Sequence, residues 1–233
     1  MSAPVCVIPG AGPGLGAALA RRFADAGYAV AMLARDPDRA GELAAGIGGA
    51  RAYACDVTDP AGIDRAFEAI ENDLGPADVL LYNAGNAAFG AVDEIEPDAF
   101  ETAWRVNTFG LYHCTRRVLP GMRAAGGGCI LVTGATASLR GGARFAGFAA
   151  AKAAQRSLAQ SMARQLGPEG IHVALAVIDG VIDTPRTREM MPDRAEDTFL
   201  DPDAIAESYL HLARQPRPAW TFELDLRPHA ESW

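Results

Sequence analysis

Hydrophobic positions along the chain alternate between two patterns. Short apolar runs rich in strand-forming residues recur between longer stretches whose apolar positions repeat at helical spacing. The short runs predict strands at Val5–Pro9, Ala29–Ala34, Arg51–Cys55, Val79–Tyr82, Cys129–Thr133, His172–Val177 and Phe222–Leu226. The longer stretches predict helices at Gly14–Ala26, Asp38–Ala45, Ala61–Asp73, Pro97–Arg123, Phe145–Leu166 and Asp203–Arg214. This alternation predicts an α/β fold of the Rossmann type, a doubly wound parallel sheet of about seven strands with helices on both faces.

One segment interrupts the alternation. The chain has 233 residues, which suits one large core, so we expect a single domain over residues 1–233. Within it, Thr184–Pro202 is the longest stretch without a clear pattern, and it is rich in charge, proline and methionine. A loop of that length in a compact domain is usually functional. We therefore expect a substrate flap at about 184–202, with Met190 as part of its apolar cover.

Composition narrows the class of protein. The longest apolar runs are far shorter than a membrane span, and 29 acidic against 21 basic residues give a net charge of −8 without a dense basic patch. These features predict a cytoplasmic protein that has a small-molecule substrate and no nucleic-acid or membrane partner. Dispersed cysteines without a CxxC pair predict buried free thiols and no metal site; they are Cys6, Cys55, Cys114 and Cys129.

Glycines cluster between the first predicted strand and the first predicted helix, in Gly10-Ala11-Gly12-Pro13-Gly14-Leu15-Gly16. Gly10 permits a tight turn, Gly14 lets the backbone approach a pyrophosphate, and Gly16 lets the helix pack closely on the sheet. The helix that starts here, Leu15 included, directs N–H groups toward the anion. Because strand, turn and helix follow in the required order, the sequence predicts a dinucleotide-binding site.

The end of the second predicted strand bears on which dinucleotide is bound. An acid there would hold the ribose 2′-OH of NAD, whereas an arginine accommodates a 2′-phosphate. The chain places Arg35 at this point and Asp36 after it, where an aspartate is expected to cap the next helix. NADP(H) is therefore favoured over NAD(H); the alternative is that Arg35 is a solvated surface charge.

Further motifs follow the glycine turn: Asp56-Val57, Asn83-Ala84-Gly85, Asn107, Lys152 and Gly180-Val181-Ile182-Asp183-Thr184. With them the chain resembles the short-chain dehydrogenase/reductase family over essentially its full length. The resemblance implies cofactor contacts by Asp56, Val57, Asn83, Ala84, Gly85, Lys152, Ile182 and Thr184. It also implies catalytic roles for Asn107 and Lys152. In that family a tyrosine moves the proton, a serine holds the carbonyl oxygen, lysine lowers the pKa of the tyrosine and asparagine orders a water relay.

Two of those four groups are missing here. Phe148 stands at the tyrosine position and Ala135 at the serine position, although a shift of one residue would place Thr136 there. The resemblance is therefore to a divergent subgroup that lacks the tyrosine. A lost general acid removes about 10²–10⁴ in rate, and a lost oxyanion donor removes about 10²–10³. We expect cofactor binding to survive and protonation of an alkoxide to fail.

Other groups are candidates for the lost acid. Thr136 or Ser138 could donate a hydrogen bond, although hydroxyls after a strand more often cap the following turn. Asp179 stands where the family usually has proline, and it would either act as an acid with a raised pKa or cap a turn. Tyr82 and Tyr112 are more often packing residues.

A substrate that can be reduced without a general acid is another explanation for the missing tyrosine. Hydride delivery to a protonated cyclic imine gives a neutral amine and no oxyanion. Phe148 would then form an apolar or cation–π wall and Asp179 a counter-charge. Arg144, beside the Gly141-Gly142 turn, would receive a carboxylate or phosphate of the substrate.

Two classes of function remain open. The first is an NADP(H)-preferring oxidoreductase that acts on a small carbonyl or imine with an altered proton-transfer site; the second is a catalytically silent nucleotide-binding sensor or partner subunit. The helices Pro97–Arg123 and Phe145–Leu166 resemble the pair that forms a four-helix dimer interface in the family. We therefore expect a homodimer or homotetramer.

Overall fold

A single seven-stranded sheet organises the protein. The computed structural model describes residues 2–230. The strands are β1 (Val5–Pro9), β2 (Ala29–Ala34), β3 (Ala50–Ala54), β4 (Val79–Tyr82), β5 (Gly128–Thr133), β6 (Ile171–Ile178) and β9 (Glu223–Leu226). Their order is β3-β2-β1-β4-β5-β6-β9, and every neighbouring pair is parallel. This confirms the predicted single-domain α/β fold, and no predicted strand boundary is wrong by more than one residue.

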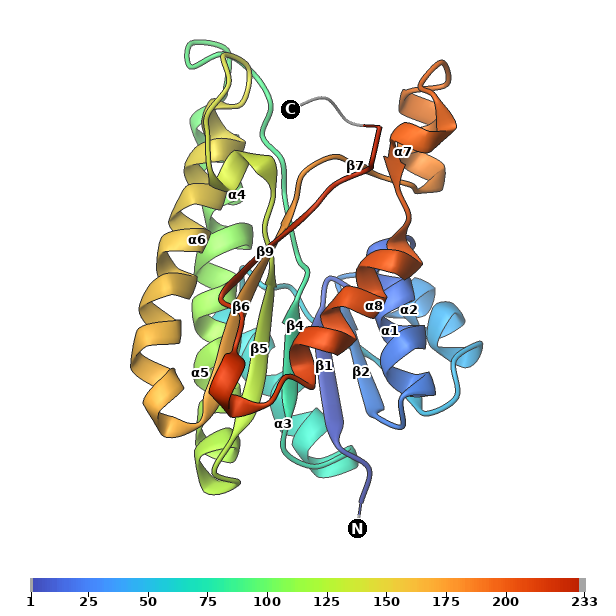
Figure 1. Cartoon of the computed structure of the whole chain (residues 1–233), viewed down its shortest axis with the longest axis vertical. Coiled ribbons are helices and arrows are strands. Elements are labelled where there is room, and N and C mark those ends of the chain that lie inside the picture. The colour runs from blue at the N-terminus through green and yellow to red at the C-terminus, as the bar shows by residue number, and fades with distance from the viewer. Residues whose placement is uncertain (1, 231–233) are drawn as a thin grey trace.

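Helices cover both faces of this sheet (Figure 1). One layer contains α1 (Leu15–Asp25), α2 (Pro37–Ala45) and α8 (Pro202–Ala213); the other contains α3 (Pro60–Asp73), α5 (Gly110–Ala124) and α6 (Ala146–Leu166). Successive side chains of a strand point to opposite faces. Val7 of β1 accordingly packs in the core under α3, α5 and α6, and its neighbour Ile8 packs in the core under α1 and α8. The central strands are buried on both faces, which explains their nearly continuous apolar sequences.

An aspartate followed by proline begins several of these helices. Asp36 caps α2 by accepting a hydrogen bond from the Arg39 N–H at 3.1 Å, which confirms its predicted role. Asp59 and Asp201 cap α3 and α8 in the same way. The side-chain oxygen satisfies a free N–H of the first turn, and proline at the first helical position has no N–H to satisfy.

The helix predicted as one element over Pro97–Arg123 is interrupted. It consists of α4 (Pro97–Trp104), a π-helical segment (Arg105–Phe109) and α5. The prediction of one regular helix was wrong because a single wide turn hardly changes the spacing of apolar residues. Such π turns are frequent at functional sites, and this one contains Asn107.

The segment 184–202 is more ordered than its sequence pattern indicates. It contains α7 (Pro185–Met190) and β8 (Phe199–Leu200), and β8 pairs with β7 (Val181–Ile182). Arg188 ties the base of the segment together through two hydrogen bonds of 2.7 Å to the Asp183 carboxylate. In Figure 1 the segment stands above the carboxyl ends of the strands, across from the tops of α4 and α6. Its role as a substrate flap stays a prediction.

The four cysteines are buried free thiols, as predicted. Burial raises the pKa of Cys55 to about 11 and raises the pKa of Cys6, Cys114 and Cys129 as well. Thiols that stay protonated are poor nucleophiles. They therefore act as small apolar core residues.

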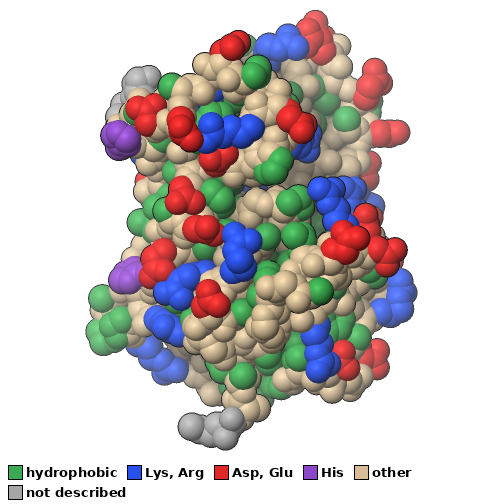
Figure 2. Space-filling model, turned by 90° about the vertical axis from the view of Figure 1, so that its right-hand side faces the viewer, with side chains coloured by type: hydrophobic (Ala, Val, Ile, Leu, Met, Phe, Trp, Pro, Cys, Tyr) green, Lys and Arg blue, Asp and Glu red, His purple; other side chains and the backbone are tan. Residues whose placement is uncertain are grey.

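The outer face of α1 and α8 is charged. Figure 2 shows basic and acidic side chains intermixed on this side of the molecule. Arg21 pairs with Asp203 at 2.9 Å, and Arg22 pairs with Glu207, so the two helices are also joined across their exposed edges.

No helix within residues 2–230 is long and apolar enough to cross a membrane.

Candidate active site

A cavity of about 810 Å³ lies at the carboxyl ends of β1, β2 and β4. Its volume is in the range of small-molecule and cofactor sites. The strand order reverses between β1 and β4, which is where doubly wound folds bind their ligands. Predicted cofactor residues that line the cavity are Gly10, Arg35, Asp56, Val57, Asn83, Ala84 and Gly85.

Three glycines of the turn, Gly10, Gly14 and Gly16, have no room for a side chain. Gly10 has a φ of 90°, and a Cβ there would lie 2.5 Å from the backbone nitrogen of Ala84. A Cβ on Gly16 would lie 2.6 Å from the carbonyl oxygen of Gly10, so the helix packs closely on the turn as predicted. Gly14 has a φ of 98°, and a Cβ there would lie 2.6 Å from the Thr184 side chain. The turn is therefore pressed between the loop after β4 and the start of α7.

A chain of hydrogen bonds fixes the turn to the sheet. Asn83 donates from Nδ2 to the Gly10 carbonyl at 2.9 Å and accepts at Oδ1 from the Thr133 hydroxyl at 3.0 Å. Tyr209 of α8 in turn donates to the Thr133 hydroxyl at 2.8 Å. Sequence analysis missed Tyr209 and Thr133; the available signal was a tyrosine on the buried face of an otherwise apolar helix.

Besides Arg186 of α7, two guanidiniums line the cavity at its β2 end. Arg35 follows β2 and Arg39 lies in the first turns of α2. Within residues 2–230, neither has a carboxylate partner, whereas the nearby Asp36 caps α2 and Asp56 accepts two hydrogen bonds of 2.8 Å from Thr58. Sequence analysis missed Arg39 because a charge in an exposed helix resembles a solvated surface residue.

Lys152 is buried at the inner end of the site, with 5% of its surface exposed. Its Nζ donates to the Thr133 carbonyl at 2.8 Å and to Gln155 Oε1 at 3.0 Å. Burial disfavours the charged form and lowers the pKa of Lys152 to about 7. The ammonium group therefore titrates near neutral pH.

Gln155 joins Lys152 to the π-helical segment. Its Nε2 donates to the Asn107 carbonyl at 2.7 Å, while its Oε1 accepts from Lys152. The Asn107 side chain donates to the carbonyls of Asn86 and Ala103 at 2.7 and 2.8 Å, and its buried Oδ1 has no partner among the described residues. Sequence analysis missed Gln155; the signal was one polar residue on the buried face of α6.

Asn107 and Lys152 converge on the loop after β4. A Cβ on Gly85 would lie 3.6 Å from Asn107 Oδ1 and 4.0 Å from Lys152 Nζ. Both predicted catalytic residues thus reach the same glycine of the dinucleotide cavity. The free Oδ1 is an acceptor that a ligand beside Gly85 can satisfy.

Phe148 lies one helical turn before Lys152, and its ring centroid is 5.9 Å from Lys152 Nζ, within cation–π range. The ring meets Phe89 edge-on at 5.6 Å, and Phe89 meets Phe145 at 5.2 Å. Phe89 is 60% exposed. The position therefore contributes an aromatic wall and no hydroxyl.

The hydroxyls after β5 have different partners. Ser138 accepts a hydrogen bond from the Ala135 N–H at 3.1 Å and so caps the turn. The Thr136 hydroxyl donates to the Asp179 carboxylate, and Asp179 also pairs with Arg227 at 3.0 Å. Asp179 is therefore not an isolated counter-charge. The sequence pattern did not indicate this, because Arg227 follows β9, almost fifty residues away.

Other predicted residues lie outside this group of contacts. Arg144 is exposed and pairs with Glu94 at 3.0 Å, and Met190 is 61% exposed. Leu15 is buried in the core at the start of α1, and Ile182 packs against the same core. The roles predicted for these four residues stay predictions.

The remaining two candidate acids are structural or exposed. Tyr82 is fully buried, and its hydroxyl donates to the Val106 carbonyl of the π-helical segment. Burial raises its pKa further. Tyr112 is 41% exposed, and Arg116 donates to its hydroxyl at 3.3 Å.

Comparison with known proteins agrees with this geometry. Residues 4–195 match the short chain dehydrogenase family, and the chain belongs to it. The "Inactive 2-(S)-hydroxypropyl-CoM dehydrogenase 2" of Xanthobacter autotrophicus is 35% identical in an alignment of 208 residues that covers 83% of this chain and 90% of that relative.

Solved structures share the whole fold. A short-chain dehydrogenase from Rhodopseudomonas palustris is 33% identical with a TM-score of 0.83, over 97% of this chain and 99% of that one. An alcohol dehydrogenase from Thermococcus sibiricus complexed with 5-hydroxy-NADP is 26% identical with a TM-score of 0.88, over 99% of both chains. The protein is thus an oxidoreductase of the short-chain type, a fold that binds a nicotinamide cofactor.

Proposed function

We propose that the protein binds NADP(H) in preference to NAD(H) and transfers a hydride between it and a small carbonyl or imine substrate. One observation supports this above the others. Lys152 and Asn107 meet at Gly85 of the dinucleotide cavity, while the helix turn that should supply a tyrosine hydroxyl supplies the ring of Phe148. This geometry supports a hydride-transfer site in which the usual tyrosine acid is absent.

The cavity fits a nicotinamide dinucleotide. Gly10 leaves space that a Cβ would fill, and Asn107 Oδ1 is a buried acceptor without a partner among the described residues. When bound, the cofactor supplies or accepts the hydride. Lys152 and Asn107 would hold and orient its nicotinamide end, and the α1 N-terminus would face its pyrophosphate.

The preference for NADP(H) rests on charge. Arg35 and Arg39 border the end of the cavity after β2, and neither is paired with a carboxylate in residues 2–230. A pair of guanidiniums suits a phosphate, and Asp36, the acid that could select a ribose 2′-OH, caps α2. The Thermococcus sibiricus relative, solved with an NADP derivative, supports the same choice.

A panel of matched small ketones and cyclic imines tests the proposal. NADPH and NADH consumption are measured at fixed protein concentration, and products are identified by mass. We expect turnover with at least one substrate class, faster with NADPH, and a loss of the NADPH preference in Arg35→Ala with Arg39→Ala. Tight NADPH binding without any product would contradict an enzymatic role.

A catalytically silent nucleotide-binding sensor is the second candidate. Gln155 occupies hydrogen-bonding groups of both Lys152 and the Asn107 backbone, and the Xanthobacter autotrophicus relative is named as inactive. This candidate also predicts NADPH binding. It differs in predicting no hydride transfer to any member of the panel.

We also propose a homodimer or homotetramer assembled through α4, α5 and α6. Large apolar side chains are exposed along α4 and α5: Phe100 is 44%, Trp104 is 42% and Tyr112 is 41% exposed. Trp104 and Tyr112 each contact the ring of Phe109, so they form one continuous aromatic strip. Contiguous apolar surface of this kind marks interaction sites.

A further inference from the structure

The hydroxyl of Thr136 is oriented as an acceptor. A hydroxyl has one hydrogen and two lone pairs, and the hydrogen of Thr136 is donated to the Asp179 carboxylate. A hydrogen bond to a carboxylate is of the strong kind, and Asp179 is only 13% exposed. The lone pairs of Thr136 therefore remain for a group that donates.

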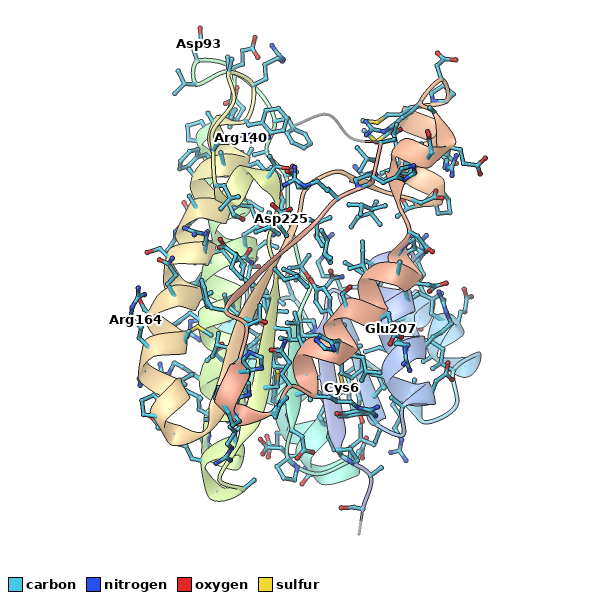
Figure 3. All side chains as sticks on the ribbon, in the orientation of Figure 1. Cys6, Asp93, Arg140, Arg164, Glu207 and Asp225 are labelled. Carbon is cyan, nitrogen blue, oxygen red and sulfur yellow. The ribbon has the colours of Figure 1, made fainter. Side chains whose placement is uncertain are left out.

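Arg227 holds this arrangement in place. It pairs with Asp179 at 3.0 Å and also with Asp225, and its side chain is 16% exposed. Figure 3 shows Asp225 on β9, near the carboxyl end of the sheet. Two carboxylates, those of Asp179 and Asp225, lie at this guanidinium, and carboxylates favour a cationic ligand.

The group lies beside the catalytic helix. The turn that begins with Thr136 packs against α6, which carries Phe148 and Lys152. Lys152 also donates to the carbonyl of Thr133, three residues before Thr136 on the same chain segment. Thr136 and Lys152 therefore border the same end of β5.

Neither Ala135 nor Thr136 offers a side-chain donor at this point. Ala135 has no hydroxyl, and the hydrogen of Thr136 is donated to Asp179, whereas Ser138 accepts from the Ala135 N–H and keeps its own hydrogen. Phe148 presents an aromatic ring, which attracts cations through its face. A ketone oxygen or an alkoxide has no hydrogen and would meet the lone pairs of Thr136, whereas a protonated imine carries both an N–H and a positive charge.

We propose that Thr136, Asp179 and Arg227 form an acceptor site that binds the N–H of a protonated imine, and that the protein is an iminium reductase. This inference rests on the hydride transfer proposed above. The hydride forms a C–H bond with the iminium carbon, and the C=N π pair becomes the lone pair of nitrogen. NADPH is oxidised to NADP⁺, and no proton is required in the step because the imine took its proton from solvent.

Three matched substrates separate hydrogen bonding from charge: a cyclic imine, its N-methyl iminium and the corresponding cyclic ketone. The N-methyl compound keeps the charge and lacks the N–H. We expect reduction of the imine, at least about tenfold slower reduction of the N-methyl iminium, and slower reduction still of the ketone. Equal kcat/KM for the imine and the N-methyl iminium, or faster ketone reduction, would overturn the proposal.

Variants of Thr136 and Asp179 test whether these residues cause the difference in rate between the imine and the N-methyl iminium. Thr136→Val should lower kcat/KM for the imine to the level of the N-methyl iminium and leave the latter unchanged, whereas Thr136→Ser should retain most of the wild-type rate. Asp179→Asn should act in the same direction as Thr136→Val. Glu223→Gln is the control, because it removes an arginine-paired carboxylate (Arg156, 2.6 Å) from the same strand, β9. An equal effect of Thr136→Val on both cations would count against the acceptor role.

A binding measurement distinguishes this proposal from the hydride transfer on which it depends. Calorimetry with the protonated cyclic amine and its N,N-dimethyl analogue, in the presence of NADP⁺, reports the acceptor site without turnover. Weaker binding of the amine to Thr136→Val, with unchanged binding of the analogue, would support the site even if no substrate were reduced. Equal binding of the amine to wild type and Thr136→Val would overturn it.

Discussion

In the proposed function Phe148 decides which reactions are accessible, because its ring stands where the resemblance to the family places a proton-donating tyrosine. The structure surrounds its ring with Lys152 on one side and the exposed Phe89 on the other. Residues predicted to bind the cofactor, Gly10, Asn83 and Gly85 among them, line the dinucleotide cavity. Proton supply, rather than cofactor binding, is therefore the step that should limit reduction of a ketone.

Introducing hydroxyls at positions 148 and 135 tests whether proton supply limits the reduction of a ketone. Phe148→Tyr combined with Ala135→Ser should raise kcat/KM for ketones by at least about tenfold, since a positioned general acid contributes about 10²–10⁴ in rate. Phe145→Tyr, in the same aromatic cluster, is the control and should change little. No gain in the double variant, with NADPH affinity unchanged, would mean that the pocket no longer positions a carbonyl.

Gly10 is restricted by its backbone and its surroundings. Gly10→Ala should lower the free energy of unfolding by about 1–3 kcal/mol, because alanine would be strained at a φ of 90° and its Cβ would overlap the Ala84 backbone. Gly12→Ala is the matched control, since nothing lies within 4 Å of a Cβ there. Urea unfolding midpoints compare the two, and equal midpoints would contradict this account of the turn.

At the residue scale, motif spacing predicted which side chains come close together. Asn107 and Lys152 were expected at the site, and the structure brings both to Gly85. Gln155 and Arg227 were not expected, because each acts through a partner that only the folded chain brings near. A lone polar residue on an apolar helix face shows that a partner exists but does not show which one.

Among the elements, the π-helical segment and α6 are joined by Gln155. The single wide turn at Arg105–Phe109 presents the Asn107 carbonyl to Gln155 Nε2, and Gln155 Oε1 accepts from Lys152. The two helices thus position the lysine together. Gln155 is a positioning residue, since it reaches the reacting groups only through Lys152.

The pH profile of kcat/KM reports this positioning. Lys152 has a pKa of about 7. The profile should therefore have a sloping limb, the range in which kcat/KM changes with pH, near neutral pH. Gln155→Leu removes an acceptor of the ammonium and should shift the limb to lower pH, whereas Gln155→Glu adds a negative charge and should shift it to higher pH. Ser157→Ala, exposed on α6, is the control. Limbs at the same pH in both Gln155 variants would contradict the proposed contact.

The segment 184–202 shows the limit of pattern reasoning for elements. A helix as short as α7 is too brief to show a period, and β7 and β8 are two-residue strands. Their order comes from local bonds, such as the Arg188–Asp183 pair. The charge and proline content of the segment therefore predicted an irregular loop, whereas the structure has short helices and strands there.

For the whole molecule, the parallel sheet was predictable because its strands are buried on both faces. Alternation of apolar runs with helical stretches then leaves few topologies, since crossovers are short and right-handed. The oligomeric state could not be predicted from the apolar pattern in the same way. An exposed aromatic strip identifies a surface without showing what covers it.

Trp104 tests the proposed assembly. Trp104→Glu places a charge in the middle of the exposed aromatic strip and should convert the oligomer to a monomer in light scattering after size-exclusion chromatography. Val92→Glu is the control, because Val92 is 84% exposed and lies outside α4, α5 and α6. An unchanged mass for Trp104→Glu would place the interface elsewhere.

Hydride transfer is the central claim, and isotope transfer tests it most directly. The protein is incubated with NADPH in which both hydrogens of the reactive nicotinamide carbon are replaced by deuterium, together with a cyclic imine, and the amine product is analysed by mass. The account predicts one deuterium per product molecule at the former iminium carbon, and none with Lys152→Met. Bound NADPH with no labelled product from imines or ketones would contradict the account and favour a nucleotide-binding sensor.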